Sequence, residues 1–180
     1  LEGGREYLGQ RLLPPHAVAT ALREWESPAR QGDAKAQRTL GLMYHLGKGV
    51  PQDYKTAMKR YGLAAEQADG DASTVLGGMY NKGWGVPRNY KTAVKWYRLA
   101  AEQGDAEAQY YLGVMYDLGE GVPESVVHAF AWLNLAAAQG DKSAAKSKDI
   151  ARNRMTAEQI AQAQKLSSEW LRKNPKLMRQ

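Results

Sequence analysis

The sequence predicts an all-α protein built from stacked helical hairpins, and three periodic features support this prediction. A Leu-Gly-x-Met-Tyr block recurs every 36 residues, starting at Leu40, Leu76 and Leu112. An aspartate recurs at the same interval, at Asp33, Asp69, Asp105 and Asp141. A Gly-x-Gly-Val-Pro segment does so as well, starting at Gly47, Gly83 and Gly119. A fixed period between about 20 and 50 residues is typical of solenoids, in which each unit buries its apolar stripe against its neighbours.

The first helix of each unit is predicted to begin just after the recurring aspartate, whose carboxylate can accept from free N–H groups of the first turn. In the first full unit, Ala36, Leu40 and Met43 then follow the spacing of a buried helical stripe. Gly41 lies in the middle of that helix, where glycine costs about 1 kcal/mol relative to alanine. Because this glycine recurs, we expect a neighbouring helix to approach it too closely for a side chain.

The second helix of each unit is predicted to follow the Gly-x-Gly-Val-Pro segment, since paired glycines permit positive φ and proline prevents the first helix from continuing. Two residues after each proline stand residues with N-cap chemistry, namely Asp53, Asn89 and Ser125. Ala57, Tyr61 and Ala64 continue at helical spacing, and the helix should end near Gln67.

Weaker matches flank the three full units. Trp25 and Gln31 align with Tyr61 and Gln67, so residues 16–32 are predicted to be the second helix of an incomplete unit. After Asp141 the loop is absent, and Thr156-Ala157-Glu158-Gln159 has the pattern of a capping box that opens a last helix. We expect the C-terminal segment to shield the open end of the stack.

The combined pattern resembles the Sel1-like repeat, a relative of the tetratricopeptide repeat. The match rests on Ala-x-Ala-Gln-x-x-Leu-Gly-x-Met-Tyr, on Gly-x-Gly-Val-Pro, and on Ala-x-x-Trp-Tyr-x-x-Ala-Ala-x-Gln-Gly-Asp. It departs at Arg60, which stands where Trp96 and Trp132 are expected, at Leu133, which replaces a tyrosine, and in the turn at residues 68–70. The resemblance implies a right-handed α/α solenoid whose first helices line a concave, protein-binding surface.

This comparison divides the chain into one solenoid domain with a C-terminal capping helix pair. The predicted segments are a partial repeat at 16–33, repeats at 34–69, 70–105 and 106–141, the cap at 142–173 and a basic tail at 174–180.

Composition limits the function classes. The absence of cysteine removes disulfides, thiolate metal sites and a cysteine nucleophile. Residues 1–140 hold 15 basic and 15 acidic side chains, whereas residues 141–180 hold 10 and 4, so the net charge of +6 belongs to the C-terminal segment. No apolar run reaches the length of about 18 residues that a membrane span needs. The chain begins at Leu1, which allows a removed signal peptide and hence a periplasmic or secreted location, with a cytoplasmic one also open.

Sequence motifs do not nominate catalytic, metal-binding or cofactor-binding residues, and we therefore expect a non-enzymatic protein. The Gly-x-Gly segments lack the preceding strand and following Lys-Ser or Lys-Thr of a phosphate loop. His16, His45 and His128 lack metal-ligand spacing, and His45 is expected to be a solvated surface residue. Most recurring aspartates are explained as helix caps.

Function is predicted to lie in positions that vary while the framework repeats, forming one strip along the first helices. We expect partner contacts at Arg38, Thr39, Leu42, His45, Thr74, Val75, Gly78, Asn81, Tyr111, Val114 and Asp117, with Trp84 near the rim. The predicted function is a scaffold or adaptor that binds another protein on its concave face.

Three more specific functions stay open. Bacterial relatives of the family are often exported, and an inhibitor or immunity partner of a secreted effector fits a shaped surface. An envelope hydrolase would need a polar cleft with a nucleophile and a base. A binder of anionic surfaces or nucleic acid would use the basic tail. The basic residues are not interleaved with aromatic side chains, and a solvated, frayed terminus is the simpler interpretation.

Overall fold

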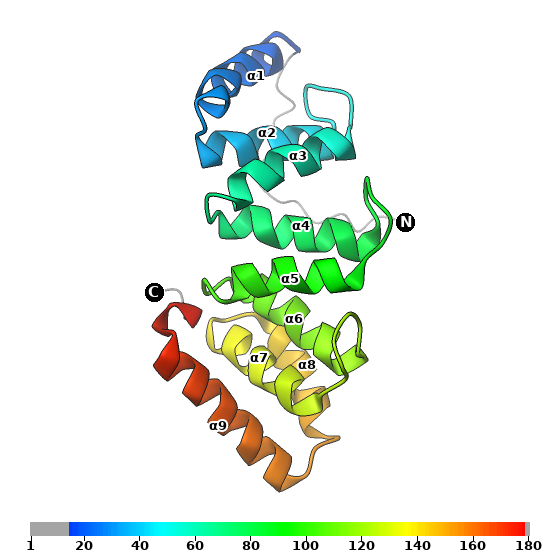
Figure 1. The fold of residues 1–180 in the computed structure, drawn as a ribbon, viewed down its shortest axis with the longest axis vertical. Coiled ribbons are helices and arrows are strands. Elements are labelled where there is room, and N and C mark those ends of the chain that lie inside the picture. Colours follow the sequence, from blue (N-terminus) through cyan, green and yellow to red (C-terminus); the bar gives the residue numbers. More distant parts are fainter. Residues whose placement is uncertain (1–14, 179–180) are drawn as a thin grey trace.

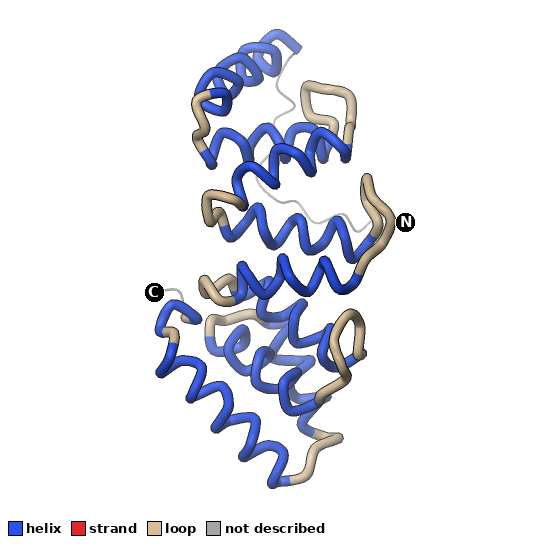
Figure 2. Tube along the Cα trace, viewed as in Figure 1, coloured by secondary structure: helices blue, strands red, loops and turns tan. Residues whose placement is uncertain are grey.

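The computed structural model describes residues 15–178 and shows an elongated stack of helices (Figure 1). Within this part of the chain all regular structure is helical, and the helices are joined by short loops (Figure 2). The elements are α1 (Pro15–Arg30), α2 (Ala34–Leu46), α3 (Tyr54–Ala65), α4 (Gly70–Lys82), α5 (Tyr90–Ala101), α6 (Ala106–Leu118), α7 (Val126–Ala138), α8 (Lys142–Arg152), α9 (Ala157–Lys173) and the 3₁₀ helix η1 (Pro175–Leu177).

The helices begin where the capping residues predict. The side chains of the recurring aspartates accept hydrogen bonds from Ala36, Ala72, Ala108 and Ala144. Asp53, Asn89 and Ser125 cap the second helices in the same way. The hairpin pairs α2–α3, α4–α5 and α6–α7 are thereby confirmed, with α1 as the preceding single helix.

The Gly-x-Gly loops turn the chain within each hairpin, and two of them also contact the preceding hairpin. Gly47, Gly83 and Gly119 end the first helices in the left-handed conformation, with φ of 66°, 75° and 68°. A Cβ added to Gly85 would lie 2.7 Å from Cβ of Tyr54, and one on Gly121 would lie 2.5 Å from the carbonyl carbon of Tyr90. Each of these loops therefore rests against the start of the second helix in the preceding hairpin.

The mid-helix glycines face the second helix of their own hairpin, as expected. A Cβ on Gly41 or Gly77 would lie 2.9 Å or 2.6 Å from the ring of Tyr61 or Tyr97, respectively. In the third hairpin, Gly113 faces Leu133, whose Cγ would be 2.8 Å from an added Cβ. Leu133 thus replaces the tyrosine without changing this packing.

The departure at residues 68–70 leaves the turn geometry intact. Asp69 N donates to Ala64 O at 3.2 Å, as Asp105 N does to Ala100 O in the next turn at the same distance. The difference is that Ala68 adopts φ of 63° where Gly104 and Gly140 stand in the later turns. The spacing between hairpins is therefore unchanged, but the backbone of Ala68 is strained.

Helices α8 and α9 cap the stack, and Thr156 and Gln159 form the expected capping box. The expectation of a frayed, solvated terminus is wrong for residues 174–178, because these pack against the solenoid. Leu177 is only 3% exposed, and its carbonyl accepts from Gln109 Nε2 at 2.7 Å. Asn174 Nδ2 donates to Glu102 O at 2.8 Å, so η1 lies beside the turn between α5 and α6 (Figure 1). Arg179 and Gln180 lie outside the described residues.

Successive hairpins also touch through their first helices at the C-terminal end of the stack. Helix α6 contacts α4 and α8 directly, whereas the second helices α3, α5 and α7 make at most marginal contact with one another.

Candidate functional site

A cleft of about 280 Å³ lies on the first helices and includes half of the predicted partner-binding residues. These are His45, Thr74, Val75, Gly78, Trp84 and Tyr111. The cleft is also lined by Asp71, Lys82, Tyr97, Asp105 and Glu107, which the sequence argument did not select. Because the lining residues come from α2, α4, the following loop, α5 and α6, repeat stacking is what creates the cleft.

The other six predicted residues lie outside this lining. Leu42 is 47% exposed, and Val114 is partly buried. Thr39 donates to the carbonyl of Lys35 at 2.8 Å, and Asp117 pairs with Arg154 of the cap. Of the remaining two, Arg38 contacts the next hairpin and Asn81 contacts Tyr97 of its own hairpin, as described below. The structure therefore divides the predicted strip between a cleft, exposed positions and contacts within the solenoid.

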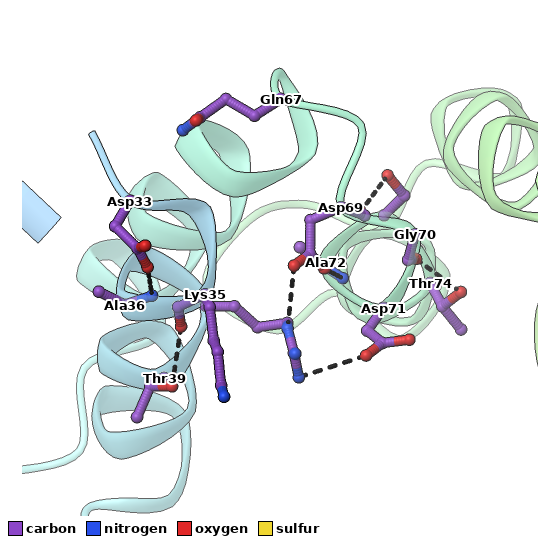
Figure 3. Close-up of polar contacts among 12 residues, drawn as sticks. Asp33, Lys35, Ala36, Thr39, Gln67, Asp69, Gly70, Asp71, Ala72 and Thr74 are labelled. Atoms are coloured by element: carbon purple, nitrogen blue, oxygen red, sulfur yellow. Dashed lines mark hydrogen bonds and ion pairs between the residues drawn. The ribbon is translucent and has the colours of Figure 1, made fainter. Parts of the chain in front are cut away.

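Arg38 bridges the first two hairpins. Its Nε lies 3.1 Å from Asp69 Oδ2, and its Nη1 lies 3.3 Å from Asp71 Oδ2. Figure 3 shows both aspartates at the start of α4, with Asp69 at the cap and Asp71 one residue inside the helix. A single guanidinium thus bridges two carboxylates of the next repeat through two different nitrogens, which its several N–H donors allow.

The next interval along the stack, between the hairpins α4–α5 and α6–α7, lacks this bridge. Thr74 occupies the position there that is equivalent to Arg38. Thr74 Oγ1 lies 3.2 Å from Asp105 Oδ1, the equivalent of Asp69, and also donates to the carbonyl of Gly70 at 3.1 Å. Glu107 occupies the position of Asp71 and has no salt bridge within residues 15–178. The shorter Thr74 side chain leaves space at the cleft.

Aromatic rings form one end of the cleft. Trp84 stacks on Tyr54 with ring centroids 5.9 Å apart, and His45 meets Trp84 edge-on at 5.3 Å. The ammonium group of Lys82 lies 4.4 Å from the centre of the Trp84 ring. Trp84 therefore packs on the preceding hairpin while it lines the cleft.

His45 is half-buried, and the expectation of a solvated surface residue is wrong. Burial lowers its pKa, and the nearby charge of Lys82 lowers it further. Its Nδ1 atom and the hydroxyl of Tyr61 are both buried and have no hydrogen-bond partner among residues 15–178. In the next repeat, Asn81 stands at the position equivalent to His45, and its side chain hydrogen-bonds Tyr97, the equivalent of Tyr61. The hydrogen bond between these two positions therefore forms in the second full repeat and is missing in the first.

Tyr97 and Tyr111 form the other wall, with stacked rings 5.1 Å apart. Burial raises the pKa of Tyr111, and the charge of Glu107 raises it further. The pKa of Glu107 is itself raised, first by partial burial and then by the carboxylates of Asp105, Asp141 and Asp71; Lys82 acts in the opposite direction. The cleft thus combines aromatic surfaces with a carboxylate that repels its neighbours.

Comparison with known proteins decides the family. The model of the Sel1 repeat matches residues 34–69, 71–105 and 106–141, which together make up more than half of the chain. The chain belongs to the Sel1 repeat family. Sel1 repeats are typically protein-interaction modules.

Two solved Sel1-type structures resemble this Sel1 repeat protein. A Sel1 repeat protein from Oxalobacter formigenes is 39% identical with a TM-score of 0.66, and the match covers 69% of this chain and 51% of that one. A protective antigen present in uropathogenic Escherichia coli strains, which displays an SLR fold, is 28% identical with a TM-score of 0.58, covering 87% and 42%. The chain therefore spans about half the length of these relatives. No curated protein matches it significantly.

One polar pair elsewhere in the Sel1 array was missed by the sequence argument. Ser125 Oγ lies 2.8 Å from His128 Nδ1, and the imidazole stacks on Tyr116 at 5.1 Å. Since Ser125 is also the N-cap of α7 and accepts from the backbone of His128, the pair belongs to a helix cap. The three-residue spacing after a predicted cap was the signal that could have revealed it.

Two further features are absent from residues 15–178. No group of three potential ligands among His, Cys, Asp and Glu is placed to hold a metal ion. No helix in this range is long and apolar enough to cross a membrane.

Proposed function

We propose that this Sel1 repeat protein is a non-enzymatic scaffold that binds a partner protein on its first helices. The observation that carries the proposal is the cleft, which gathers side chains from successive repeats at positions where the repeated framework varies. Residues that build the framework, such as Leu40 and Leu76, are buried in the hairpin cores and are not available for binding.

The test compares charge substitutions on the first helices with charge substitutions on the second helices. Leu42→Glu with Val114→Glu places charge on the first helices, whereas Leu63→Glu with Leu99→Glu places it on the second helices, where these leucines are 36% and 39% exposed. Cross-linking and affinity capture from the native host would identify a partner, and its dissociation constant would then be measured for both variants. We expect loss of affinity only for the first pair. Loss only for the second pair would place the interface on the second helices and refute the proposal.

We further propose that the partner is an exported bacterial effector that is inhibited by occlusion, with the protein acting in the periplasm or outside the cell. Support comes from the cleft on the first helices, because occlusion requires a complementary surface and no reacting group. Co-expression with candidate toxins of the same host tests this: protection together with a stable complex is expected. Absence of both would contradict the inhibitor function and leave the scaffold function standing.

A further inference from the structure

The two successive intervals of the solenoid offer an internal comparison. In the first, Arg38 occupies the space beside Asp69 and Asp71 and pairs with both. In the second, Asp105 and Glu107 stand at the same repeat positions, and Thr74 replaces the arginine. The first interval is thus closed by its own guanidinium, while the second presents a cleft.

The open interval has the electrostatics of a cation site. Its lining contains three carboxylates, from Asp71, Asp105 and Glu107, against the single ammonium group of Lys82. Lys82 lies over the Trp84 ring, and Asp71 is paired with Arg38. Burial raises the pKa of Glu107 first, and repulsion by the neighbouring carboxylates raises it further; a positive group placed beside Glu107 would relieve that repulsion.

We propose that the cleft binds an arginine side chain of the partner protein, whose guanidinium takes the place at Asp105 and Glu107 that Arg38 takes at Asp69 and Asp71. The inference rests on the proposed protein-binding function and specifies the chemistry of the partner. Arginine suits the cleft better than lysine because its planar fork spans two carboxylates and can stack on an aromatic face such as that of Tyr111.

The first test uses a small probe and the intact chain. Nα-acetylarginine amide would be titrated into the protein while ¹⁵N NMR records the backbone amides that line the cleft and the indole N–H of Trp84. We expect saturable shifts there, weakening with added salt, and no such shifts from the citrulline analogue, which has a similar shape without the charge. Equal binding of the two probes, or no saturable shift with the arginine probe, would overturn the proposal.

Two variants test the cleft from opposite directions. Glu107→Gln removes one charge, and about tenfold weaker binding is expected from the loss of a charge-assisted contact. Thr74→Arg supplies the missing arginine from within and should block the probe. Glu66→Gln, in an exposed turn at the end of α3, is the control with the same change in net charge and should bind normally. Unchanged binding in Glu107→Gln would refute the proposal even if Thr74→Arg failed to fold.

The outcomes separate this inference from the scaffold function. A captured partner could lose affinity for the variant with Leu42→Glu and Val114→Glu, yet bind Glu107→Gln as tightly as the original chain. That result would support the scaffold function and refute the arginine-binding cleft. Specific binding of the arginine probe without any partner on the first helices would keep the cleft and remove the scaffold.

Discussion

Ala68 shows how a single backbone conformation records the departure from the repeat. Its φ of 63° lies in a region where an L-residue is strained by about 1–2 kcal/mol. Ala68→Gly should therefore raise the free energy of unfolding by about 0.5–1 kcal/mol, because relief of strain exceeds the greater entropy of glycine in the unfolded chain. Urea-induced unfolding followed by circular dichroism measures the change.

The control is the equivalent turn at the end of the third repeat. Gly140 has φ of 90°, and an added Cβ would meet no atom within 4 Å. Gly140→Ala should lower stability by about 1 kcal/mol through backbone strain alone. If both substitutions changed stability in the same direction, backbone strain would not be the cause.

The half-buried imidazole of His45 should make stability depend on pH. Its pKa in the folded chain lies below the ordinary value of 6.5, so just below that pH the unfolded chain binds the proton more readily. The free energy of unfolding should consequently fall as the pH falls from 7.5 to 5.5. His45→Asn, which copies Asn81 of the next repeat, should show a smaller fall over this range in denaturant titrations. An identical slope in the variant would show that folding does not lower the pKa of His45.

Periodicity predicted where the varying side chains occur along the chain but not what each one contacts. Arg38 meets Asp69 across 31 residues, and the packing of His45 against Trp84 also depends on how one hairpin sits on the next. A repeat alignment treats every varying position alike, since it contains no information on these approaches. For that reason the sequence did not identify the acids Asp105 and Glu107 as residues of the cleft. The recurrence of Asp105 was already explained by its function as a helix cap.

At the scale of helices, two glycines with opposite environments give a sharp prediction. A Cβ on Gly77 would collide with the Tyr97 ring at 2.6 Å, whereas one on Gly62 in α3 would meet nothing within 4 Å. Gly77→Ala should destabilise the protein by about 1–3 kcal/mol through overpacking. Gly62→Ala should stabilise it by up to about 1 kcal/mol through helix propensity.

Thermal and urea unfolding of both variants provide the measurement. Stabilisation by Gly77→Ala would mean that α4 and α5 can separate freely, contrary to the packing described. The counterparts of Gly62 are Arg98 and Asn134, so this position accepts side chains elsewhere in the array.

Helix starts, turns and pairings were predictable because their causes are local. Asp33 or Ser125 caps a helix through groups two or three residues away, and the loop glycines set the turn by their own dihedral angles. The close approach at Gly113 was also predictable, although its partner is Leu133 in place of a tyrosine. Repetition strengthened each local signal by presenting it three times.

At the scale of the whole molecule, the docked C-terminus is expected to stabilise the end of the array. Leu177 packs in the same core as Trp132 and Leu135, and its carbonyl receives the buried Gln109 amide. Leu177→Ala should lower the free energy of unfolding by about 2–4 kcal/mol. Leu118→Ala is the control, since Leu118 is 60% exposed, and it should change stability by no more than about 0.5 kcal/mol.

Hydrogen exchange would localise the effect of Leu177→Ala. Because units in a solenoid contact mainly their neighbours, protection should fall most in α6, α7 and α9 and least in α2. Uniform loss of protection would indicate that the array unfolds as one unit. This docking could not be predicted from the sequence, because residues 174–178 follow no repeat and their basic character obscured the single buried leucine.

The contacts of Gly85 and Gly121 with the preceding hairpin also give assembly a direction. Gly85 rests on Tyr54 and Gly121 rests on Tyr90, so each loop packs on a surface that was synthesised earlier. A hairpin leaving the ribosome therefore finds its docking platform already in place, and no unit has to wait for a later one to complete its loop. The described array is suited to growth from its N-terminal end during translation, and η1 docks after the turn between α5 and α6 has formed.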